Sequence, residues 1–210
     1  MSLVTNWGYN LTDEQLTALP DLMSAEEFAT YTAGKYAGDT RIASEIKAAS
    51  QAIRNYCGWH IYPSLACSMT ERLLYGNGRT KRVGDDLMIQ LPARFVTAIN
   101  SVTIDDVSFT DFYFDQNGIV HVFDIPDLTR KSEVTIDYTA GASDALMDSV
   151  KELLVHRVSH AASASDGVTS ETAGGMSVTY SAGWANSARA SSLPDDSKDT
   201  LAPFKVQGVF

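Results

Sequence analysis

Residues 42–60 read IASEIKAASQAIRNYCGWH, and this stretch decides the fold. Its apolar side chains recur at spacings of four, three, four and three residues, as they do along one face of an α-helix. These apolar positions are Ile42, Ile46, Ala49, Ile53 and Tyr56. Asp39 stands where an N-cap is expected, and Gly58 stands where a C-cap is expected. The stretch therefore predicts a long amphipathic helix with one buried face.

Two shorter helices are expected before this long helix. Thr12 and Gln15 have the spacing of a capping box, and so do Ser24 and Glu27. In a capping box each side chain accepts a hydrogen bond from the other residue's backbone N–H, which fixes where a helix begins. The N-terminal region is therefore predicted to be helical.

After the long helix, apolar and polar residues alternate, which is typical of β-strands with one buried face. Val134, Ile136 and Tyr138 show this alternation most clearly. The Asn-Gly pairs at 77–78 and 117–118 are typical of type I′ hairpin turns, in which both central residues need positive φ. No helical segment separates the strands, so the sequence predicts an antiparallel sheet rather than a parallel one.

A second long helix is predicted from about Asp144 to Ala162. Its apolar stripe consists of Met147, Val150, Leu154, Val158 and Ala161. The opposite face carries Asp148, Glu152, His156 and His160. This helix is also predicted to bury one face.

The two histidines of that polar face have to be considered as metal ligands. His156 and His160 are four residues apart, a spacing that can hold zinc on a helix. The metalloprotease pattern requires Glu directly after the first His, and Arg157 stands there. We predict a solvated or subunit-facing stripe, with no metal and no cofactor. A metal-dependent hydrolase built on these histidines is the alternative from a different functional class, and bound zinc would support it.

Other catalytic patterns are also missing from the sequence. It contains no nucleophile elbow, phosphate-binding loop or dinucleotide fingerprint. Cys57 is expected at a helix C-terminus, where the helix dipole raises the pKa of a thiol rather than lowering it. We therefore predict that the chain is not an enzyme and has no catalytic residues.

The charge of the chain limits its partners. The formal net charge is −10 and the sequence pI is about 4.7. Such a chain repels phosphate and anionic lipid, so tight binding to nucleic acid or to a membrane surface is not expected. No uninterrupted apolar run exceeds three residues, and the first residues lack a secretory pattern. The chain is expected to be made in a cytoplasm.

The composition shifts towards the C-terminus. Of the 34 residues from 159 to 192, 24 are Ala, Ser, Gly or Thr. This stretch offers too little large apolar surface to offset the entropy of ordering it. Within it, Met176, Val178 and Tyr180 alternate like a short strand, and the chain ends on apolar residues. The pattern predicts an arm that becomes ordered on a partner.

A small basic cluster lies beside the first Asn-Gly pair. It consists of Arg79, Lys81 and Arg82. The simplest interpretation is an exposed loop tip. The functional interpretation is a contact with an acidic partner surface or with passing DNA.

These observations define the predicted fold class as α+β. The fold is a small helical bundle, with two long helices plus shorter ones, a β-rich antiparallel insertion and an extended C-terminal arm. The expected parts are N-terminal helices over 1–64, the β-rich insertion over 65–141, the second long helix over 142–163, and the arm over 164–210.

Four short segments, in this order, resemble the head–tail connector (adaptor) proteins of long-tailed bacteriophages. They are Ile42–His60, with its helix ending in Tyr-Cys-Gly-Trp; the turn Thr139-Ala140-Gly141; Ser170–Ser181; and Leu201–Lys205. The resemblance covers about residues 22–210, and the first twenty or so lie outside it.

The resemblance implies a structural virion protein of the neck. It implies a homo-oligomeric ring of twelve copies beneath the portal protein, above a stopper or tail-completion protein, through which DNA passes without specific binding. The composition of the arm, its alternation and its apolar end make it the candidate portal-binding element, with the candidate residues Met176, Val178, Tyr180, Phe204, Lys205, Val206, Val209 and Phe210. Another phage neck or tail-completion protein is the nearest alternative. An acidic ring suits a DNA conduit, because like charge keeps the duplex from binding the wall.

Overall fold

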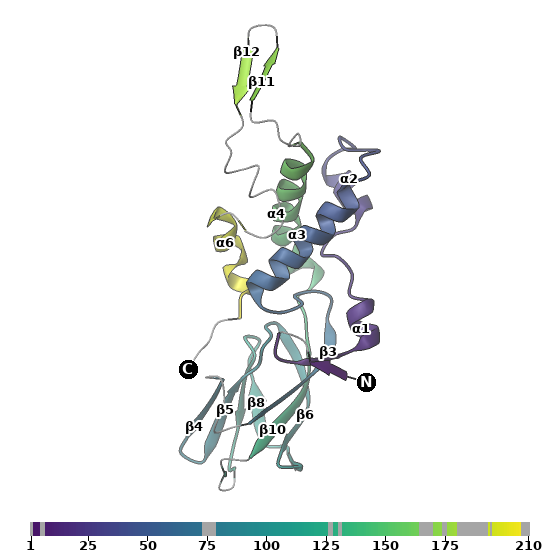
Figure 1. Cartoon of the computed structure of the whole chain (residues 1–210). Helices are drawn as coiled ribbons and strands as arrows, with labels where there is room; N and C mark the ends of the chain where they lie inside the picture. The colour runs from purple at the N-terminus through teal and green to yellow at the C-terminus, as the bar shows by residue number, and fades with distance from the viewer. Residues whose placement is uncertain are drawn as a thin grey trace. The chain divides into compact units, whose positions relative to one another are not determined.

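The structure is a computed structural model that describes residues 2–4, 7–72, 79–125, 128–129, 132–163, 170–173, 176–179, 193 and 195–206 (Figure 1). The chain divides into two compact units. The β-rich unit consists of residues 1–19, 57–143 and 204–210, and the helical unit consists of residues 20–56 and 144–203. The prediction of an α+β chain with antiparallel sheets is confirmed.

The β-rich unit contains two sheets in which every described pairing is antiparallel. The larger sheet has the spatial order β1 (Ser2–Val4), β2 (Asn10–Thr12), β3 (Leu65–Arg72), β10 (Glu133–Ala140), β6 (Val96–Ile104) and β7 (Val107–Phe109). The smaller sheet has the order β4 (Thr80–Val83), β5 (Asp86–Gln90), β9 (Ile119–Val122) and β8 (Phe112–Phe114). The short helix α1 (Asp13–Thr17) follows β2 and begins with the expected Thr12–Gln15 capping box.

Strand β10 is the centre of the larger sheet. It pairs with β3 on one side and with β6 on the other, so that Ile136 is in register with both Met69 and Val102. The alternating residues Val134, Ile136 and Tyr138 are each fully buried. The predicted alternation therefore identifies the core face of this sheet correctly.

The turns differ from the prediction in one respect. At the second Asn-Gly pair only Gly118 has positive φ, and the N–H of Asp115 donates to the carbonyl of Ile119 at 3.0 Å. The β8–β9 hairpin therefore has a three-residue loop rather than the predicted type I′ turn. The type I′ backbone occurs instead between β6 and β7, where Asp105 and Asp106 have φ of 48° and 64°. The pair at 77–78 lies outside the described residues.

The strands β1 and β2 were not predicted. They pair with each other, and Asn10 is in register with Ser68 of β3. The expected short helix α1 is present, but the residues before it extend the larger sheet. Strands of three residues are too short to show a clear alternation in the sequence.

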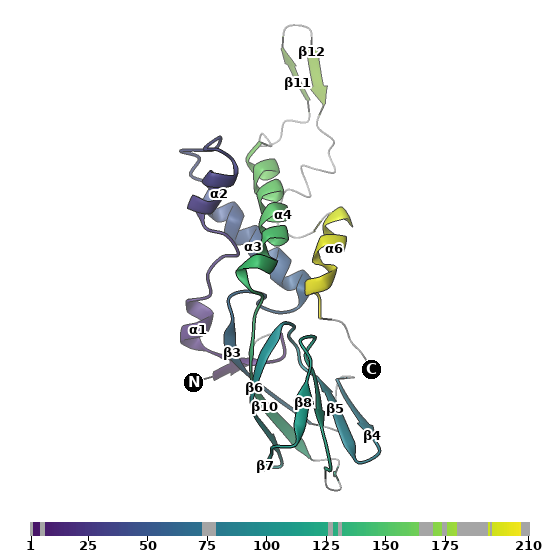
Figure 2. The ribbon, with the colours of Figure 1, turned by 180° about the vertical axis from the view of Figure 1, so that it is seen from behind.

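The helical unit contains α2 (Ala25–Tyr31), α3 (Ile42–Cys57), α4 (Asp144–Ser163), the hairpin strands β11 (Ser170–Ala173) and β12 (Met176–Thr179), and α6 (Asp195–Leu201), which the 3-10 turn η1 (Ala202–Phe204) follows. Figure 2 shows α2, α3 and α4 from behind. Helix α2 begins with the predicted Ser24–Glu27 capping box. Asp39 does not cap α3, because the helix begins at Ile42 and the Asp39 carboxylate accepts the backbone N–H of Arg41 instead.

Side-chain bonds join the helices of this unit. The Lys151 ammonium of α4 lies 2.6 Å from the Glu27 carboxylate of α2, which lowers the pKa of Glu27, mainly through this hydrogen bond. The Ser50 hydroxyl of α3 accepts the backbone N–H of Leu22 at 3.0 Å. The apolar stripes of α3 and α4 are buried as predicted, except that Tyr56 and Ala161 are half-buried.

Gly141, in the predicted Thr-Ala-Gly turn, provides a test of the β-rich core. A Cβ at this position would overlap the backbone of Pro63 and Ser64. We expect Gly141→Ala to lower the free energy of unfolding by at least about 2 kcal/mol, because backbone atoms cannot move aside as a flexible side chain can. Thr110→Ala, at an exposed position between β7 and β8 of the same unit, is the control. Denaturant unfolding would contradict this packing if the two variants were equally stable.

Candidate functional site

The residues at the end of α3 and directly after it form hydrogen bonds with the C-terminal segment of the β-rich unit. The indole N–H of Trp59 donates to the carbonyl of Phe204 at 2.6 Å, and the Phe204 ring lies 5.4 Å from that of Phe95. The backbone N–H of Val206 donates to the carbonyl of Cys57 at 3.1 Å. Trp59 and Phe204 are both buried. The segment around Phe204 is therefore part of this unit's core.

His60 holds two further segments of the same unit. Its Nε2 lies 3.0 Å from the carbonyl of Pro63 and 3.1 Å from that of Ala140. Carbonyls only accept, so Nε2 carries the proton, and Nδ1 accepts the hydroxyl hydrogen of Tyr9 at 2.6 Å. The Tyr9 oxygen in turn accepts the backbone N–H of His60 at 3.0 Å. His60 is therefore structural, and its partners Tyr9 and Ala140 could not be read from the sequence.

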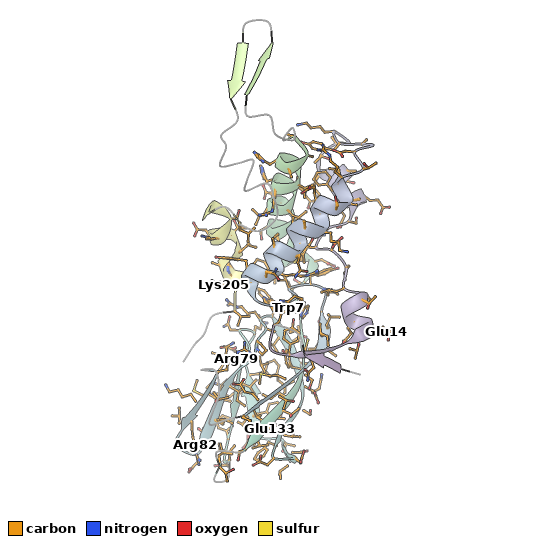
Figure 3. The ribbon with its side chains drawn as sticks, in the orientation of Figure 1. Trp7, Glu14, Arg79, Arg82, Glu133 and Lys205 are labelled. Carbon is orange, nitrogen blue, oxygen red and sulfur yellow. The ribbon has the colours of Figure 1, made fainter. Side chains whose placement is uncertain are left out.

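The predicted portal-binding residues have different environments. Phe204 is buried in its own chain, so its ring is not exposed for a contact with another protein. Lys205 is exposed and Val206 is half-buried. Val209 and Phe210 lie outside the described residues, as does Tyr180. Figure 3 labels Lys205 in this terminal segment.

Met176 and Val178 belong to the hairpin of β11 and β12. The strands are antiparallel, with Met176 in register with Ala173 and Val178 in register with Glu171. The alternation in the sequence therefore predicted strand β12 correctly. Among the strands that the structure describes, these two pair only with each other. An isolated two-stranded hairpin is at best marginally stable in water.

The basic cluster lies partly within β4 and partly before it: Arg79 precedes the strand, and Lys81 and Arg82 belong to it. Arg79 is half-buried, and its guanidinium lies against Gly8, where an added Cβ would come within 2.6 Å of it. Lys81 and Arg82 are exposed on β4 itself. Arg82 lies 3.9 Å from Asp85 in an exposed ion pair, a distance at which such pairs contribute little stability. Figure 3 labels Arg79 and Arg82 on this side of the unit. Of the three residues of this cluster, only Lys81 and Arg82 are exposed.

The polar face of α4 lies outside the core, opposite the buried apolar stripe, as predicted. Glu152 and His156 are exposed, and His160 is half-buried. Within the described part of the chain, no three His, Cys, Asp or Glu side chains are grouped so that they could hold a metal ion. None of the helices that the structure describes is long and apolar enough to cross a membrane.

Both cysteines are buried thiols. Burial raises the pKa of Cys57 to about 12, and the nearby Lys205 charge only partly opposes this effect. Burial also raises the pKa of Cys67 to about 12. The predicted direction for Cys57 is correct, but the main cause is burial rather than the helix dipole. A thiol that stays protonated is a poor nucleophile.

The described residues include outer strands with no further strand beside them and a hairpin whose two strands pair only with each other. They define an α+β protein suited to contacts with other protein chains. The family model of head completion proteins (HCP) matches residues 21–190, and the chain belongs to this family. No curated protein matches the sequence. Among solved structures, a chain from "Neck of empty GTA particle computed with C6 symmetry" is similar, with 17% identity and a TM-score of 0.49, over 92% of this chain and 94% of that one.

Family membership confirms the predicted class. The chain is a structural, non-enzymatic protein of the bacteriophage head completion family. The metal-dependent hydrolase is therefore set aside.

The buried thiols give a direct test of this part of the structure. In the folded protein at pH 8 both cysteines should react with a thiol reagent far more slowly than the exposed cysteine of a Ser143→Cys variant. Because their folded pKa lies above the ordinary value of 9.0, their contribution to stability is complete below about pH 9 and is lost as the pH rises towards 12. Equal reaction rates at native pH would show that the thiols are not buried.

Proposed function

We propose that the chain is the head–tail adaptor. Copies form a ring beneath the portal, extend the DNA channel and provide the platform on which the stopper or tail docks. Twelve copies match the portal symmetry implied by the resemblance. Membership of the head completion family supports a role in closing the filled head. The net charge of −10 supports a channel wall to which DNA does not adhere.

The observation that carries the portal contact is the hairpin of β11 and β12. It lies within the Ala, Ser, Gly and Thr-rich stretch, and the described part of the chain places no third strand beside it. A strand edge of this kind can pair with the edge of a neighbouring chain, in which main-chain hydrogen bonds provide affinity and alternate side chains provide specificity. Met176 and Val178 occupy alternate positions of β12.

The arm over 164–210 therefore remains the proposed portal-binding element, with a changed division of roles. The hairpin makes the contact, and Phe204 anchors the arm's end to its own chain through Trp59. Affinity per copy is modest because ordering a segment costs free energy, and a ring of many copies multiplies it.

The test is the occupancy of the chain on DNA-filled heads. We expect Met176→Ser with Val178→Ser to reduce binding to the portal strongly, because a buried apolar interface residue typically contributes about 2 kcal/mol or more when it is a hot spot. Ser177→Ala with Thr179→Ala changes the alternate positions of the same strand and is the matched control. Heads are purified with each variant, and the bound chain is quantified.

Wild-type occupancy of the serine variant, and of a variant lacking 170–179, would overturn the portal contact of the arm. Docking would then come from the helical unit. Absence of even the wild-type chain from portal-bearing heads would favour another neck or tail-completion role.

A further inference from the structure

The outer strands of the smaller sheet run in opposite directions. The order β4-β5-β9-β8 contains three antiparallel pairings, so β4 and β8 are antiparallel to each other. A second copy in the same orientation, placed beside β8, would therefore bring its own β4 there as an antiparallel neighbour. In the described part of the chain, neither outer strand has another strand on its second side.

The hydrogen-bonding pattern of β8 fixes which residues face that neighbour. The N–H of Phe123 donates to the carbonyl of Asp111, and the N–H of Asp115 donates to the carbonyl of Ile119. Asp111 and Asp115 therefore direct their backbone groups towards β9. Backbone groups alternate sides along a strand, so those of Phe112 and Phe114 point outward.

The same reasoning applies to β4. The N–H of Gln90 donates to the carbonyl of Arg79, and Val83 and Asp86 flank a two-residue turn. These pairs place Arg79, Lys81 and Val83 towards β5, and Arg82 directs its backbone groups outward. We align β4 of one copy with β8 of the next so that the two strands overlap fully. Arg82 then lies opposite Phe112, and Lys81 lies opposite Tyr113.

The facing side chains complement one another. Lys81 and Tyr113 are both exposed, and Tyr113 keeps 51% of its surface. Asp111 and Asp115 share the face of Tyr113 and would lie diagonally from Lys81, within reach of a long side chain. On the other face, Phe112 is only half-buried, although Val122 beside it in register is fully buried. The Arg82 guanidinium and its stem could cover that ring.

We propose that copies of this chain join head to tail through the smaller sheet, with β4 of one copy paired to β8 of the next. The partner is a second copy of this chain. The inference rests on the proposed ring and names its subunit contact. A head-to-tail contact is heterologous, and it forms a ring where the rotation between copies closes. The β4 edge is basic and the β8 edge is acidic. Pairing of β4 with β4, or of β8 with β8, would place like charges opposite each other, which is unfavourable.

The test is a disulfide between the two edges. Lys81→Cys and Tyr113→Cys in one chain are three strand spacings apart, about 14 Å, which is too far for a bond within the chain. In the proposed contact they form a directly opposite pair at disulfide distance. The native Cys57 and Cys67 are buried and do not compete. Oxidation is carried out on the concentrated full chain and on particles that contain it.

We expect a ladder of disulfide-linked multimers, several-fold stronger than that of a control chain with Lys81→Cys and Val107→Cys. Val107 is exposed on β7, an outer strand of the other sheet. Adding Asp111→Lys to the test chain should weaken the ladder, whereas the same charge change at the exposed Asp148 of α4 should not.

If the disulfide-linked ladder of the test chain is no stronger than that of the control chain, in the concentrated chain or in the particles, the inference is overturned. If the chain is found in a ring at the neck without that ladder, the ring stands and the edge contact fails. If the chain is absent from the neck, the proposed function fails, and the concentrated chain alone decides the edge contact.

Discussion

The β-rich unit depends on the hydrogen bonds made by Trp59 and His60, directly after the end of α3. Trp59 holds the C-terminal segment, and His60 holds both Tyr9 and the end of β10 at Ala140. Both rings are fully buried, so a ring nitrogen left there without any partner would cost about 1–3 kcal/mol. Segments from the start, middle and end of the chain thus meet at two adjacent residues.

The regular elements could be predicted from the sequence because their signals are local. The spacing of Ile42, Ile46 and Ile53 defines one face of α3, and the alternation of Val134 and Ile136 defines the core face of β10. The capping boxes also mark the true starts of α1 and α2. Each of these patterns follows from the geometry of a single element.

What could not be predicted depends on partners distant in the sequence. In the sequence Phe204 is part of an apolar terminus expected to bind a partner, and only its hydrogen bond to Trp59, 145 residues away, shows that it belongs to the core. Strand β2 exists because β3 provides an edge at Ser68. Of the turns that the structure describes, the type I′ turn forms at Asp105 and Asp106 rather than at the Asn-Gly pair of 117–118, because strand register decides loop length. The candidate contact surfaces were the hardest part to predict from the sequence, because no local sequence pattern marks the edge of a sheet.

The central claim is that this member of the head completion family is a ring subunit bound to the portal. The most direct measurement is imaging of the virion neck at a resolution that locates this chain. The account predicts a closed ring of identical copies in contact with the portal, with the segment over 170–179 at that contact. Copies located elsewhere in the particle, or a ring that does not touch the portal, would contradict it.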